Sequence, residues 1–127
     1  MVIITRTEFE DLVNKAVAQL PKIYAEKLKN VAFIVEDVPS LEQRESLKLR
    51  VDQTLFGLYE GVPLSKRQGV LKTLPDKITI FQKPLEYASN NIEELFEKTG
   101  RTIWHEVAHY FGLDHEMIGN LEKKEKN

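Results

Sequence analysis

All three histidines of this chain lie in one short segment, at His105, His109 and His115, and Glu106 directly follows the first. On a helix, residues four positions apart differ by only about 40° around the axis. The imidazoles of His105 and His109 therefore project side by side and can reach one metal ion. Glu106, turned by about 100° from His105, can touch a water molecule on that ion without being a ligand. The spacing predicts a metal site with an acid–base residue beside it.

A glycine after the second histidine indicates how the third one can join the site. Gly112 lies three residues past His109, where a helix commonly ends in a left-handed residue that glycine adopts at little cost. The chain can then turn back and bring His115 to the same ion. Asp114 or Glu116 could orient one of the imidazoles, although nothing in the sequence selects either of them.

The type of ligand points to zinc. The chain has no cysteine, so a metal must be held by His, Asp or Glu. Three neutral imidazoles that leave a fourth position to water are typical of a catalytic zinc site, where the pKa of the water falls to ~7. We therefore predict one Zn²⁺ ion held by His105, His109 and His115. Glu106 is predicted to be the general base for attack on a carbonyl and to return the proton to the leaving amine.

Length and composition predict a single domain. A chain of 127 residues with 42% hydrophobic residues can form one core but hardly two, so residues 1–127 are expected to fold together, with a frayed tail from about residue 121. The net charge of −2 does not favour a nucleic-acid partner. The sequence contains neither the apolar run of a signal peptide nor the ~20 apolar residues of a membrane span. A cytoplasmic protein without a membrane partner is expected; the sequence does not indicate its oligomeric state.

Two helices are expected before the first strand. Thr7 and Glu10 have the spacing of a capping box, and apolar residues then recur at intervals of three and four residues up to Leu20. Pro21 can open a second, short helical segment that runs to Leu28, because proline is tolerated at the first helical position. The first of these helices should bury one apolar stripe.

Three segments have the composition of strands. Residues 31–35 are apolar and rich in β-branched side chains, which predicts a buried strand. Residues 54–59 predict a strand in which Gly57 marks a bulge or a close approach. Residues 77–82 largely alternate polar and apolar side chains, so this strand could lie at a sheet edge and pair there with an extended peptide. The charged stretch 41–53 is expected on the surface.

The histidines are expected on the last helix. Asn90 and Asn91 can cap it, and apolar residues at helical intervals continue as far as Ala108. Gly100 lies inside this pattern. The sequence does not decide whether Gly100 divides the segment into two helices.

The chain resembles the small bacterial zincin-like metallopeptidases, which are single-domain proteins of about this length. The likeness lies in residues 31–39, 55–64, 74–81 and 105–114. Its specific pieces are Gly-Leu-Tyr-x-Gly-Val-Pro from Gly57 and Leu-Pro-Asp-x-Ile from Leu74. The resemblance implies an α+β fold of the minimal zincin type, in which a small mixed sheet packs against the helix that carries H-E-x-x-H. It also implies peptidase activity on a peptide or protein substrate.

The resemblance leaves the third ligand open. Members of the family often carry an acidic residue where His115 stands, so Asp114 or Glu116 is an alternative to this histidine.

Two other functions stay open. Bacterial rRNA maturation endoribonucleases resemble this chain in three histidines at the same spacing and in a Gly-x-Asp-His ending, here Gly112 to His115. Those enzymes usually have glycine after the first histidine, whereas Glu106 supplies the base that a peptidase needs. The other alternative is a metal-binding interaction module that catalyses no reaction.

Overall fold

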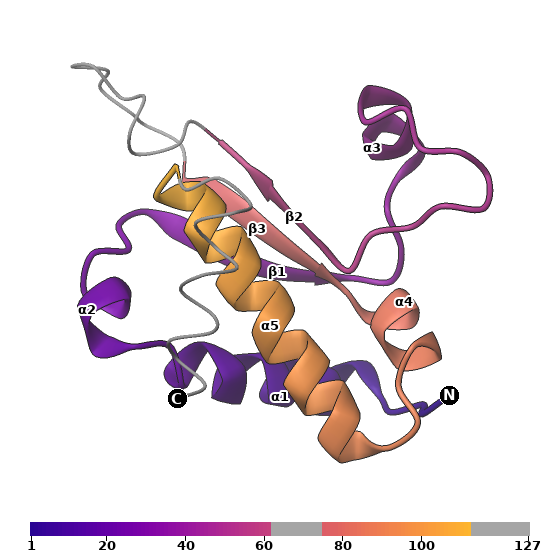
Figure 1. Cartoon of the computed structure of the whole chain (residues 1–127), viewed down its shortest axis with the longest axis horizontal. Helices are drawn as coiled ribbons and strands as arrows, with labels where there is room; N and C mark the ends of the chain where they lie inside the picture. Colours follow the sequence, from indigo (N-terminus) through magenta and orange to yellow (C-terminus); the bar gives the residue numbers. More distant parts are fainter. Residues whose placement is uncertain (62–74, 113–127) are drawn as a thin grey trace.

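The computed structural model describes residues 1–61 and 75–112, which form a three-stranded sheet and five helices (Figure 1). The elements in chain order are α1 (Arg6–Ala18), α2 (Lys22–Ala25), β1 (Val31–Glu36), α3 (Leu41–Ser46), β2 (Gly57–Glu60), β3 (Asp76–Phe81), α4 (Gln82–Tyr87) and α5 (Ile92–Tyr110). The predicted α+β class, with a small mixed sheet against the histidine-bearing helix, is confirmed.

β3 lies in the middle of the sheet, with β1 parallel to it on one side and β2 antiparallel on the other. The prediction that residues 77–82 lie at a sheet edge is therefore wrong. Thr79 is a polar position in the alternating pattern and was therefore expected on a solvated face of the strand. It is only 1% exposed, because Ile34 and Leu58 flank it on the neighbouring strands. Among the described strands the edges are β1 and β2. β1 is accordingly half-buried rather than buried as predicted.

One apolar core joins the sheet to α5, which crosses one of its faces, and to α1, which packs against α5 (Figure 1). Its fully or nearly fully buried members are Phe9, Leu12, Val13, Ala16, Ile78, Ile80, Leu85, Leu95, Ile103, Trp104 and Val107. Full burial of one Leu, Ile or Phe side chain stabilises the fold by about 1.5–3 kcal/mol. The core thereby holds α5 in a defined position on the sheet.

The capping box of α1 lies two residues earlier than predicted from Thr7. The hydroxyl of Thr5 accepts a hydrogen bond from the backbone N–H of Glu8 (3.1 Å), and the Glu8 carboxylate accepts one from the N–H of Thr5 (3.0 Å). The residues just before Thr5 are hydrogen-bonded to Glu86 of α4, which holds the chain extended up to this point. The predicted apolar stripe is nevertheless buried, because an earlier start leaves its spacing unchanged.

α2 is shorter than the predicted segment from Pro21 to Leu28. Pro21 stands just before its first residue, and the helix ends after one turn. Asn30 has a φ of 56°, a left-handed conformation that asparagine tolerates better than most residues. This residue redirects the chain into β1.

α5 is one continuous helix of 19 residues that Gly100 does not interrupt. The side chain of Asn91 accepts a hydrogen bond from the N–H of Glu94 (2.8 Å), which caps the helix as predicted. Neither α5 nor any other helix in residues 1–61 and 75–112 is long and apolar enough to cross a membrane.

Replacing Gly100 with alanine should stabilise the protein by about 1 kcal/mol, because glycine is that much less favourable inside a helix. A Cβ atom at this position would have nothing within 4 Å of it. Gly112→Ala is the matched control and should lower the free energy of unfolding. Gly112 has a φ of 79°, a conformation in which alanine is strained. Urea unfolding of both variants measures the two changes. A fall in stability for Gly100→Ala would contradict the uninterrupted helix.

Candidate metal centre

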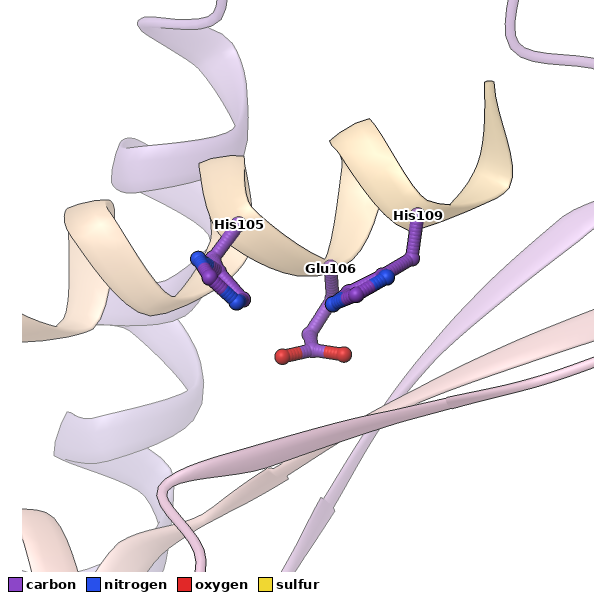
Figure 2. A group of neighbouring side chains, drawn as sticks. All are labelled: His105, Glu106 and His109. Atoms are coloured by element: carbon purple, nitrogen blue, oxygen red, sulfur yellow. The ribbon is translucent and has the colours of Figure 1, made fainter. Parts of the chain in front are cut away.

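His105, Glu106 and His109 come together on the last turns of α5. Figure 2 shows their side chains on one side of the helix. Each offers one ligand atom, and these atoms all lie within 4.8 Å of one another. The two imidazole rings have centroids 4.9 Å apart, with an angle of 72° between their planes. The helical spacing thus brings together the three residues that the sequence analysis expected to be neighbours.

The group of donors fits a zinc ion. At Zn–N distances of about 2.0–2.1 Å, the ligand atoms of a tetrahedral site lie roughly 3.4 Å apart. The limit of 4.8 Å includes Glu106, which is not expected to be a ligand, so the donor atoms of the two imidazoles lie at most this far apart, near the spacing that one ion requires. Two imidazoles suit zinc far better than magnesium or calcium, which prefer oxygen ligands.

The predicted third ligand lies outside the described residues, as do the two acidic alternatives; these are His115, Asp114 and Glu116. The turn that should lead to them is described. Gly112 adopts a left-handed φ of 79° directly beyond α5, and its N–H donates a hydrogen bond to the carbonyl of His109 (2.9 Å). The predicted helix-ending role of Gly112 is confirmed.

Glu106 is a buried carboxylate, 8% exposed, that contacts β2 as well as its own helix. Its Oε1 accepts a hydrogen bond from the backbone N–H of Tyr59 (3.0 Å). Burial raises the pKa of Glu106 to about 7, and the hydrogen bond from Tyr59 acts in the opposite direction. A carboxyl group with this pKa can both accept and release a proton near neutral pH.

Gly57 allows β2 to approach α5 closely, as its position in the strand pattern predicted. A Cβ atom on Gly57 would lie 2.6 Å from Cγ2 of Thr102, 3.2 Å from the carbonyl oxygen of Thr79 and 3.3 Å from Cγ of Glu106. No side chain fits there unless strand and helix move apart. The close approach is what brings the backbone of Tyr59 to the Glu106 carboxylate.

A methyl group at Gly57 should therefore destabilise the protein by about 2 kcal/mol, because overpacked positions typically cost 1–3 kcal/mol. Urea unfolding of Gly57→Ala measures the loss. Gly100→Ala is the matched control, since the same added methyl group meets open space there. Equal stability of Gly57→Ala and the unaltered protein would show that β2 and α5 are not in the contact described.

A surface pocket of about 380 Å³ lies beside the candidate metal centre. It is lined by Thr54, Leu55, Phe56, Gly57, Arg101, Thr102, His105 and Glu106. Residues 54–56 were predicted as the first part of a strand, but β2 begins at Gly57. Their place beside the preceding turn of α5 was not predicted, because only the packing of β2 against α5 brings the two segments together. The two predicted functional residues in this lining thus face a space that a substrate could enter.

A sequence profile of the zincin-like metallopeptidases matches residues 28–125, which is well over half of the chain. No curated protein is similar enough to count as a match. The profile covers all three strands and α5, and its last part reaches beyond His115. The sequence resemblance is thereby confirmed, and the mixed sheet against the H-E-x-x-H helix agrees with a minimal zincin-like fold. The chain belongs to the zincin-like metallopeptidase family.

Proposed function

We propose that this protein is a zinc-dependent peptidase in which Glu106 is the general base. The observation that carries the proposal is the buried Glu106 carboxylate between two imidazoles suited to zinc, facing a pocket at a sheet edge. Membership of the family supports a metal-dependent hydrolase of peptides.

His105 and His109 would hold the ion, and His115 would be the third ligand, with Asp114 or Glu116 as its alternatives. When bound, zinc supplies a Lewis acid that makes a water molecule acidic enough to lose a proton near neutral pH.

Glu106 would accept the proton of the attacking water and deliver it to the amine that leaves. Its Oε1 is held by the N–H of Tyr59, while Oε2 accepts no hydrogen bond from the described residues and is the oxygen for proton transfer. Without metal, burial raises the pKa of Glu106 to about 7. A bound zinc ion would lower this pKa and so favour the carboxylate form that accepts the proton.

β2 is an edge strand among the described residues, and its outer side offers a place for an extended peptide. Phe56 accepts a hydrogen bond from the N–H of Phe81 (2.9 Å), so its backbone faces β3. Alternate residues of an antiparallel strand face opposite sides, and Gly57 and Tyr59 are therefore directed toward the edge, where the N–H of Tyr59 already donates to Glu106. A peptide added along this edge would lie beside Glu106. This role belongs to β2 and not to the strand at 77–82.

The alternatives receive less support. A ribonuclease would need to attract phosphate groups, and the net charge of the chain is −2. An interaction module that catalyses no reaction does not need a buried carboxyl group such as Glu106 beside the metal ligands. A chain without cysteine suits a reducing compartment, and we place its peptide or protein substrate in the cytoplasm.

Incubation of the zinc-loaded protein with a peptide mixture, and separately with structured and single-stranded RNA, tests the function. We expect peptide cleavage that a chelator abolishes and added zinc restores, and no RNA cleavage. Cleavage of RNA alone would replace the peptidase by a ribonuclease. Turnover of neither substrate would favour the interaction module.

A further inference from the structure

A second surface pocket, of about 460 Å³, lies next to the one that contains Glu106. Its lining is Val38, Thr54, Phe56, Lys83, Pro84, Tyr87 and Ala88. The residues come from three separate segments: the turn after β1, the segment before β2, and α4. Most of the lining is apolar, and nothing in the proposed proton transfer uses it.

Large apolar side chains at this pocket are unusually exposed. Val38 is 53% exposed, Phe56 38% and Tyr87 79%. Single exposed apolar residues are common on protein surfaces, but a gathering of them around a hollow marks a binding surface. Three such residues around one pocket therefore indicate a binding surface.

The two pockets are neighbours along the same piece of chain. Thr54 and Phe56 line both of them. A molecule that fills the pocket beside Glu106 and extends along the segment 54–56 therefore reaches the apolar pocket.

The distance between the pockets corresponds to a few residues of an extended peptide. Gly57 lies beside Glu106, since a Cβ atom on it would be 3.3 Å from Cγ of that residue. Thr54 precedes Gly57 by three residues, and a fully extended chain rises about 3.3 Å per residue, so with the bend at Phe56 the separation is at most about 10 Å. A peptide aligned with this segment covers that length with about three residues.

We infer that the apolar pocket formed by Val38, Phe56, Pro84 and Tyr87 is a subsite for a hydrophobic side chain of the peptide substrate, about two to four residues from the scissile bond. The inference rests on the proposed peptidase function. Such a subsite makes the enzyme selective for peptides that carry a large apolar residue at one fixed position. The positive charge of Lys83, which also lines the pocket, repels a basic side chain there.

Two measurements test the subsite, and one of them does not depend on activity. Short capped peptides of Ala, Gly and Ser that carry one Phe, one Lys or neither are titrated into the isotope-labelled Glu106→Gln protein, and amide chemical shifts are recorded. We expect the Phe peptide to shift the amides of Val38, Phe56 and Ala88 and to bind about tenfold more tightly than the peptide without Phe. The Lys peptide should not shift them.

The second measurement is the profile of cleavage sites that the zinc-loaded protein selects in a peptide mixture. Large apolar residues should be enriched at one position on one side of the scissile bond. Val38→Asp should bring the preference for Phe over Ala close to unity, and Tyr87→Ala should reduce it. Val51→Asp is the matched control, because Val51 is fully exposed and lines neither pocket. Thermal melting checks that each variant is folded.

The outcomes separate the subsite from the peptidase. Cleavage without an apolar preference, together with no shift at Val38, Phe56 and Ala88, would overturn the subsite and leave the peptidase standing. Shifts at these amides without any cleavage would overturn the peptidase, and with it the role of the pocket in substrate selection, and would leave only a pocket that binds apolar side chains. Self-association that Val38→Asp abolishes, measured by analytical ultracentrifugation, together with an absence of peptide-induced shifts would assign the pocket to a second copy of the chain and overturn the subsite.

Discussion

Replacing Glu106 with glutamine should lower the rate of peptide cleavage by about 10²–10⁴-fold, the usual contribution of a general base. The amide has nearly the same shape and can still accept the hydrogen bond from the N–H of Tyr59. It cannot accept a proton from water. Zinc content should stay at about one ion per chain, because His105 and His109 remain in place.

Glu93→Gln is the matched control for this experiment. Glu93 lies exposed in the first turn of α5, far along the helix from the histidines, so the same chemical change should leave both cleavage and zinc content as they were. Peptide cleavage is followed by mass spectrometry and bound zinc by metal analysis. Full activity in Glu106→Gln would exclude this residue as the base.

The part of the site that the sequence predicted is the part that one helix makes by itself. His105, Glu106 and His109 meet because of the helical repeat, whatever the helix packs against. Gly112 ends that helix for an equally local reason, since its left-handed φ suits glycine. Local geometry also explains why the cap at Asn91 was correctly predicted.

The features that the sequence did not predict depend on contacts between distant segments. Nothing in the residues around Tyr59 indicates that its backbone N–H binds Glu106, because this bond needs β2 to be packed against α5. The central place of β3 was missed for a similar reason. Thr79 counts as polar in an alternating pattern, yet the neighbouring strands bury it. The cap of α1 was predicted at Thr7 but lies at Thr5, whose side chain is paired with the backbone N–H of Glu8.

The metal-free protein should lose stability as the pH rises from about 4.5 to about 7, through the ionisation of Glu106. Below pH 4.5 this carboxyl group is protonated in both the folded and the unfolded chain. Between the two values the unfolded chain gives up the proton while the folded protein keeps it, because burial has raised the pKa to about 7. The folded state therefore becomes less favourable with rising pH, by about 3 kcal/mol in total.

The contribution of Glu106 is isolated by comparing the unaltered protein with Glu106→Gln, in the presence of a chelator, by urea unfolding across this pH range. The carboxyl groups of Glu8 and Asp37 have lowered pKa values and change stability in the opposite sense, but they are present in both proteins and cancel. The glutamine variant should gain relative stability as the pH rises, levelling off above about 7. Added zinc should reduce this pH-dependent difference in stability between the two proteins, because a nearby cation favours the carboxylate form of Glu106. A difference that does not change with pH would show that the carboxyl group of Glu106 is solvated, and that its environment does not tune it for proton transfer.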